Sequence, residues 1–189
     1  MPPSIFRAAI PCLAALLLAS GCVASRQAAS LASFEAALAG RDSATATLEA
    51  WCAERGLADP ARVTAEPADG PAMPLPPQDR AALGVSPEEP LGYRHVRLAC
   101  GGRVLSDARN WYVPARLPRE MNDTLETTDT PFGKVVAPLG FRRERLSSER
   151  GAAEGCPQGT VLSHRALLRL PDGRAISLVL ECYLEENLR

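Results

Sequence analysis

Strand-type residues on both sides of Gly101-Gly102 form the clearest pattern in the chain. The glycine pair supplies the positive φ angles that a tight turn between antiparallel strands needs, and Pro114 closes the second run because proline cannot donate to a ladder. Residues 93–114 therefore predict a β-hairpin. In a regular register Arg94 lies opposite Arg109, and two like charges at opposite positions require a neighbouring carboxylate or a bound anion.

A second hairpin is predicted near the end of the chain, where residues 161–170 and 175–184 flank a Pro-Asp-Gly-Arg turn. The last run alternates, with its leucines and Cys182 on one face and Glu181 on the other. A carboxylate in a mostly apolar strand is unfavourable unless it is paired, hydrogen-bonded or solvated. Glu181 is thus either a solvent-facing residue on the outer side of the sheet or the partner of the two arginines in the first hairpin.

Helical spacing of apolar residues predicts two helices that cover the sheet. The first spans residues 31–38 and stops near Gly40, and the second begins at Asp42 or Ser43 and runs to residue 55. The pattern is that of an α+β domain, an antiparallel β-sheet built from hairpins with helices packed on one side. We further predict a short strand at 62–65, a proline-rich surface loop at 67–90, a short helix within 117–130, a strand at 141–146 and a loop at 147–159.

The start of the chain has the layout of a bacterial lipoprotein signal. Arg7 precedes an apolar run that is too short to remain as a spanning helix, and Leu18-Ala19-Ser20-Gly21-Cys22 then matches a lipobox. A plain secretory signal and an uncleaved anchor are the alternatives. We expect a signal peptide at residues 1–21, lipidation at Cys22, a tether at 22–30 and one folded domain at 31–189.

Lipidation anchors a protein to a membrane without making it span the bilayer. Val23 after the modified cysteine favours sorting to the outer membrane. The expected location is therefore the bacterial cell envelope, lipid-anchored in the outer membrane and facing the periplasm. Removal of Arg7 changes the formal net charge from -1 to about -2, which argues against nucleic acid as a partner.

Four cysteines remain after export and lipidation, namely Cys52, Cys100, Cys156 and Cys182. An even number of cysteines in an oxidising compartment predicts two disulfides, and three connectivities are open. The chain has no Cys-x-x-Cys pair, and His95 and His164 are isolated from one another in the sequence. We therefore expect no metal site, and both histidines are taken as ordinary strand residues.

A series of short motifs follows in order along the predicted domain: Asp42-Ser43-Ala44-Thr45, Arg94, Ala108-Arg109 with Pro114, Thr130-Pro131-Phe132-Gly133, and Glu181. Their order and spacing resemble those of the chorismate pyruvate-lyases and of the related ligand-binding domains called UTRA. The resemblance covers most of the mature chain and rests on no single motif. It departs from the family where Phe132 replaces the leucine of Thr-Pro-Leu-Gly, and Ala44 stands where a bulkier contact residue sits.

The resemblance implies a cofactor-free elimination, in which chorismate loses its enolpyruvyl group as pyruvate and leaves 4-hydroxybenzoate. It implies that Arg94 binds a substrate carboxylate and that Glu181 is catalytic, contacting the ring oxygen where the ether bond breaks. Arg109 and Phe132 are candidates for further ligand contacts. A guanidinium fork suits a carboxylate through two charge-assisted hydrogen bonds, and a partly buried glutamate suits proton transfer at the ether oxygen.

Export argues against adopting that activity directly, because chorismate is a cytoplasmic intermediate. The favoured hypothesis is an exported lipoprotein whose chorismate lyase-like domain binds a small aromatic carboxylate, with catalysis not established. One alternative is an active chorismate pyruvate-lyase. Another is a structural envelope lipoprotein in which Arg94, Arg109 and Glu181 form an internal ion cluster. The expected partners are the small carboxylate and the membrane, reached through the lipid anchor, and no cofactor is expected.

Overall fold

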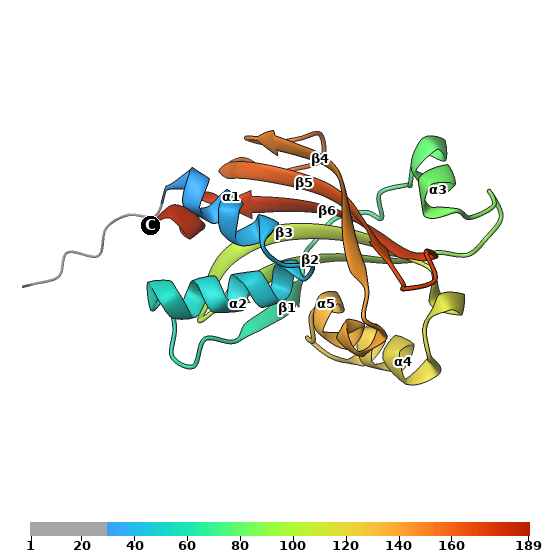
Figure 1. Cartoon of the computed structure of the whole chain (residues 1–189), viewed down its shortest axis with the longest axis horizontal. Helices are drawn as coiled ribbons and strands as arrows, with labels where there is room; N and C mark the ends of the chain where they lie inside the picture. Colours follow the sequence, from blue (N-terminus) through green and yellow to red (C-terminus); the bar gives the residue numbers. More distant parts are fainter. Residues whose placement is uncertain (1–29) are drawn as a thin grey trace, which may run out of the picture.

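The computed structural model describes residues 30–189, and a six-stranded antiparallel sheet runs through them in the order β1-β2-β3-β6-β5-β4 (Figure 1). This confirms the predicted sheet built from hairpins. The predicted signal peptide, Cys22 and most of the tether lie outside the described residues. The strands are β1 (Val63–Pro67), β2 (Gly92–Cys100), β3 (Arg103–Tyr112), β4 (Arg142–Arg150), β5 (Thr160–Arg169) and β6 (Ala175–Leu184).

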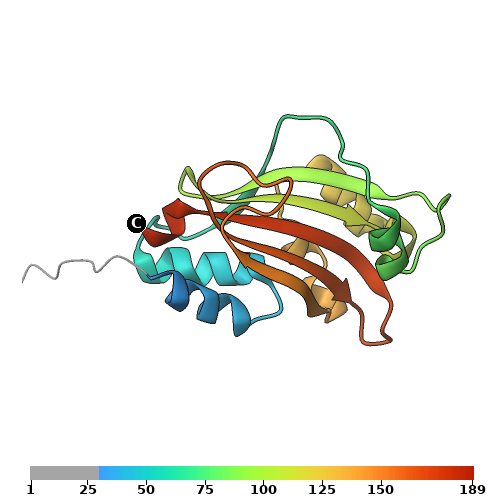
Figure 2. The ribbon, with the colours of Figure 1, turned by 90° about the horizontal axis from the view of Figure 1, so that it is seen from above.

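Helices cover one face of this sheet, as predicted, and Figure 2 shows them from a second direction. Phe34 and Trp51 pack against Tyr183 of β6 in one core cluster, and Leu125 and Phe132 belong to a second cluster. No helix within residues 30–189 has both the length and the apolarity to cross a bilayer. The helices on this face are α1 (Leu31–Ala39), α2 (Ala44–Arg55), α4 (Arg119–Thr127) and α5 (Phe132–Val135), and short 3-10 turns occur at η1 (Pro114–Arg116), η2 (Ala137–Leu139) and η3 (Glu185–Leu188).

Capping residues define both ends of α2, and a disulfide joins it to the sheet. Ser43 caps its first turn by accepting a hydrogen bond from the backbone N–H of Ala46 at 3.2 Å. Gly56 ends the helix with a left-handed φ of 53°. A disulfide between Cys52 and Cys100 joins α2 to β2. The caps therefore set where α2 begins and ends, and the disulfide ties its last turn to the sheet.

The four cysteines of the domain form two disulfides, as predicted. Cys52 is bonded to Cys100, and Cys156 in the loop after β4 is bonded to Cys182 in β6. This selects one of the three connectivities that the sequence left open. The first disulfide supports the helical face of the sheet, and the second fastens the loop at 151–159 to the opposite face.

The first hairpin has the predicted turn but a different register. Cys100 pairs with Arg103, and both turn glycines have positive φ angles. A β-bulge follows, because Leu105 is an extra residue in β3 between the partners of Leu98 and Ala99. Arg94 therefore lies opposite Asn110 and not opposite Arg109, so the predicted arginine pair is wrong.

The proline-rich segment is not the featureless loop that we predicted. It contains α3 (Pro77–Leu83), which starts with a proline at its first position and ends at Gly84. Leu83 packs on the sheet face opposite to α2, in a cluster with Trp111 and Leu178. Arg116 holds the end of this helix by donating to the carbonyl oxygens of Leu83, Gly84 and Ala175 at 2.9, 2.7 and 2.6 Å.

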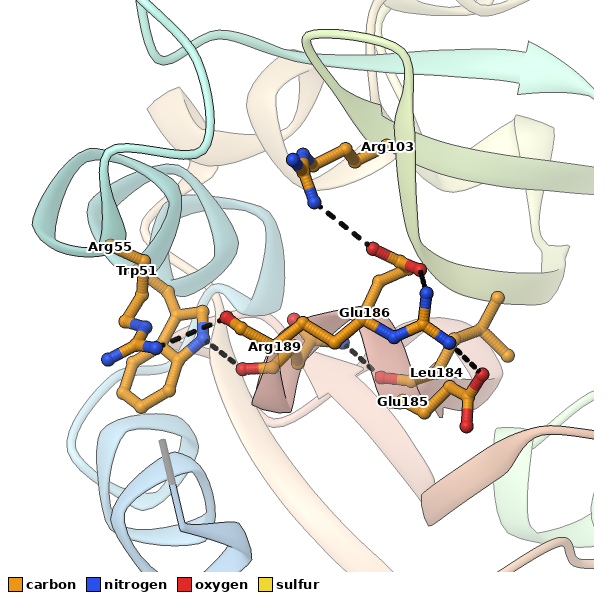
Figure 3. A network of polar contacts seen from close by, with 8 residues as sticks. Trp51, Arg55, Arg103, Leu184, Glu185, Glu186 and Arg189 are labelled. Atoms are coloured by element: carbon orange, nitrogen blue, oxygen red, sulfur yellow. Dashed lines mark hydrogen bonds and ion pairs between the residues drawn. The ribbon is translucent and has the colours of Figure 1, made fainter. Parts of the chain in front are cut away.

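A polar network fastens η3 to α2 and β3 (Figure 3). The indole N–H of Trp51 donates to the carbonyl oxygen of Asn187 at 3.0 Å, and the Asn187 amide donates to the carbonyl oxygen of Leu105 at 2.7 Å. Around them, Arg103 contacts Glu186 at 3.4 Å. These contacts fix the end of β6, the strand that carries Glu181.

Candidate functional site

A cavity lies between the helical layer and the sheet, beside the N-terminal end of α2. Two small residues line this space, Ala108 in the middle of β3 and Gly133 in α5. A Cβ atom added to Gly133 would lie 3.1 Å from Thr45 Oγ1, so this glycine allows α5 to approach α2 closely. The walls are mainly apolar and include Val96, Phe132, Phe141, Leu168 and Val179.

The cavity has the size of a small ligand. The centres of water-sized spheres can occupy about 50 Å³ of it. This is far below the ~300–1,000 Å³ of pockets for drug-sized ligands, so only a small ligand, such as a single ring that carries a carboxylate, suits the cavity.

Glu181 lines the cavity, and its ionic partner is Arg143 of β4. Arg143 donates from both terminal nitrogens, with Nη1 3.2 Å from Glu181 Oε1 and Nη2 in contact with Oε2. The hydroxyl of Tyr183 donates to Oε2 at 2.7 Å. Both alternatives that the sequence offered for Glu181 are therefore wrong. The residue is buried and does not face solvent, and its partner is Arg143 from the edge strand β4, not Arg94 or Arg109.

This ion pair is removed from solvent, since the side chains of Arg143 and Glu181 are only 7% and 9% exposed. Burial by itself lowers the pKa of the Arg143 guanidinium, but the nearby Glu181 and Tyr183 outweigh it and raise the pKa above its ordinary value. Burial, followed by the charge of Glu181, raises the pKa of the Tyr183 hydroxyl. Burial also lowers the pKa of His164, opposite Glu181, to about 4. At neutral pH His164 and Tyr183 therefore add no charge to the ion pair.

Arg94 lines the same cavity from β2. Its Nη1 donates to the carbonyl oxygen of Thr130 at 3.3 Å, and no carboxylate within residues 30–189 forms an ion pair with it. Burial lowers the pKa of its guanidinium, although an arginine side chain stays charged in proteins. The cavity thus contains a half-buried positive charge whose counter-charge the described chain does not supply.

Asn110 lies opposite Arg94 in the hairpin and also lines the cavity. Its Oδ1 accepts a hydrogen bond from the hydroxyl of Ser177. Its Nδ2 is shielded from solvent and has no hydrogen-bond partner among the described residues. Buried amide donors are normally satisfied, so a residue that lines the cavity carries an unused donor.

Arg109 does not line the cavity. Because side chains alternate along a strand, Arg109 points to the opposite face from Asn110, where it lies opposite His95. There its Nη1 donates to Asp107 Oδ1 at 3.0 Å, and His95 Nε2 lies 2.9 Å from the same oxygen. The bulge at Leu105 sets this arrangement, and the ligand contact predicted for Arg109 does not fit it.

The cavity thus brings together three of the four predicted ligand-site residues, Arg94, Phe132 and Glu181, and it adds Arg143 and Asn110. Neither addition was found from the sequence. Arg143 lay within a predicted strand, but arginines at several positions of that strand gave no reason to single it out. Asn110 was hidden by the regular register, which placed Arg109 where Asn110 lies.

No protein-family model matches the chain. Among solved structures, the crystal structure of PhnF from Mycobacterium smegmatis aligns with a TM-score of 0.55 at 14% identity, over 79% of this chain and 67% of its own. The effector domain of the same protein aligns with a TM-score of 0.54 at 15% identity, over 77% of this chain and 90% of its own. These similarities establish that the fold is UTRA-like.

A relative at the sequence level is the uncharacterized protein y4mC from Sinorhizobium fredii. The two sequences are 41% identical over 177 residues, which span 84% of this chain and 75% of the relative. Identity at this level over most of both chains reflects common descent and a shared fold. The chain therefore belongs to the family of the Sinorhizobium fredii protein y4mC.

Proposed function

We propose that this protein binds a small carboxylate of single-ring size in the cavity beside α2 and catalyses no reaction on it. The observation that carries the proposal is Arg94, a half-buried guanidinium in a mainly apolar cavity with no carboxylate partner in the described chain. A bound carboxylate would supply the missing negative charge and accept hydrogen bonds from the free N–H groups of the guanidinium. Phe132, Phe141 and Leu168 offer apolar surface for a ring.

The similarity to PhnF fits a binding role. The matched part of that protein is described as an effector domain, and 90% of that domain is covered by the present chain. Fold alone does not determine activity, so the free Arg94 carries the argument and the similarity supports it.

Chorismate lyase activity is the less favoured candidate. The resemblance of the sequence assigns Glu181 to the breaking ether bond, but this carboxylate already accepts three hydrogen bonds from Arg143 and Tyr183. Each contact uses Glu181 as an acceptor, and one acceptor position remains on Oε1. These contacts fit Glu181 as the ionic partner of Arg143 better than as a proton donor to a substrate.

Calorimetric titration of residues 25–189, which include the whole sheet and both disulfides, tests the binding role. We expect 4-hydroxybenzoate to bind with one-to-one stoichiometry and chorismate to yield no pyruvate. Pyruvate release that Glu181→Gln abolishes would instead establish a lyase. If neither heat of binding nor pyruvate is detected, the binding proposal fails and a structural role takes its place.

We also propose that the domain is held at the outer membrane by lipid on Cys22 and faces the periplasm. The lipobox and the two disulfides support this location, because both are typical of exported proteins. Expression in bacteria with a radiolabelled fatty acid should label the full chain and leave the Cys22→Ser variant unlabelled. Equal labelling of the two proteins, or a labelled cytoplasmic fraction alone, would contradict the proposal.

A further inference from the structure

Two polar groups of the cavity face each other because of the bulge in the first hairpin. The extra residue Leu105 shifts the register by one, so Arg94 of β2 pairs with Asn110 of β3. Residues at opposite positions of an antiparallel pair have Cβ atoms about 4.5–5.5 Å apart and project to the same face. The bulge therefore places a guanidinium and a carboxamide side by side in the wall of one cavity.

Asn110 is held in one orientation by its neighbours. The residue is 5% exposed, and the hydroxyl of Ser177, which is fully buried, donates to its Oδ1. This contact leaves Nδ2 as the group without a partner. Other side chains with an unpartnered buried atom, such as Ser106, Asn122 and His164, do not line this cavity. An acceptor on a bound ligand would satisfy the Nδ2–H and remove an unfavourable feature of the empty site.

The charge balance of the cavity limits what that acceptor can be. Arg143 is neutralised by Glu181, and Asp42 lies exposed at the rim, where it accepts from the backbone N–H of Arg143 at 2.9 Å. Arg94 is left as a single uncompensated positive charge inside the cavity. One negative charge on a ligand balances it, whereas a second would be buried against apolar walls without a partner.

We propose that Asn110 is a second ligand-binding residue and that, with Arg94, it selects a planar, singly charged carboxylate over a doubly charged phosphonate or phosphate. This inference rests on the proposed binding function. Both carboxylate oxygens accept from the Arg94 guanidinium, and one of them also accepts from Nδ2 of Asn110. The two donors come from adjacent strands, so their spacing is set by the sheet and needs no change of the backbone.

The test compares two ligands that differ only in the anionic group, 4-hydroxybenzoate and 4-hydroxyphenylphosphonate, by calorimetry at pH 8. The wild-type protein should bind the carboxylate at least about 10-fold more tightly, since the phosphonate is doubly charged at this pH. Asn110→Ala should weaken 4-hydroxybenzoate binding by about 10-fold. Asn110→Asp keeps the side-chain shape and should weaken it further, because its carboxylate would neutralise Arg94.

Asn122→Ala is the matched control, because Asn122 is another asparagine with an unpartnered buried atom and lies outside the cavity. It should leave binding unchanged, and thermal melting of each variant shows whether the fold is kept. If 4-hydroxybenzoate binds and Asn110→Ala does not weaken it, the role of Asn110 is wrong while the binding function stands. Equal or tighter binding of the phosphonate would overturn the charge argument. No binding of 4-hydroxybenzoate to the wild-type protein would refute the proposed function itself.

Discussion

Replacing Arg143 by alanine should lower the free energy of unfolding by about 3–5 kcal/mol, since it leaves a buried carboxylate without its cationic partner. The side chains of Arg143 and Glu181 are 7% and 9% exposed, so water cannot readily take the place of the lost guanidinium. Tyr183 would still donate one hydrogen bond to Glu181, but a neutral donor does not balance the charge. Urea unfolding at neutral pH, followed by circular dichroism with both disulfides intact, measures the change.

Two further variants separate loss of charge pairing from loss of side-chain volume. Arg145→Ala removes an exposed arginine from the same strand and should change the free energy of unfolding by less than about 0.5 kcal/mol. The double variant Arg143→Met with Glu181→Leu removes both charges and should lie much closer to wild type than Arg143→Ala does. A loss below about 1 kcal/mol in Arg143→Ala would mean that the ion pair is solvated, against the geometry described above.

Local signals in the sequence were sufficient for most of the fold. Gly101-Gly102 and Gly173 have the positive φ angles that their turns require, so both hairpins were found from the turn residues. Ser43 and Gly56 mark the ends of α2 because capping is decided by the residues at the helix ends themselves. Each of these features depends on a few neighbouring residues, and a single sequence contains that information.

The composition of the cavity depended on features that are not local. The bulge at Leu105 has no glycine or proline to signal it, and a shift of one residue exchanges Arg109 for Asn110 at the site. The partner of Glu181 is Arg143, from a strand two positions away in the sheet. That strand continues to Arg150, beyond the predicted end at residue 146. Nothing in the sequence indicated this continuation, because the residues of this edge strand are mostly charged and exposed and show no apolar alternation.

Replacing Arg94 by alanine should weaken 4-hydroxybenzoate binding by about 2–5 kcal/mol, because the ligand carboxylate would be desolvated in an apolar cavity without its counter-charge. That corresponds to a loss of affinity of about 30-fold or more. Stability should change much less, since the side chain of Arg94 makes one long hydrogen bond, 3.3 Å to the carbonyl oxygen of Thr130, and has no ion pair in the described chain. Calorimetric titration and thermal melting of the same preparation measure the two effects.

Arg109→Ala is the control on charge, because Arg109 lies one residue from Asn110 on the opposite face of the sheet and contacts Asp107 there. It removes the same charge from the protein and should leave ligand affinity unchanged. Arg94→Lys should bind with intermediate affinity, because it keeps the charge and loses the planar fork that holds a carboxylate at two points. If Arg109→Ala weakens binding as much as Arg94→Ala, the ligand responds to net charge and not to this cavity, and the carboxylate site beside α2 would have to be abandoned.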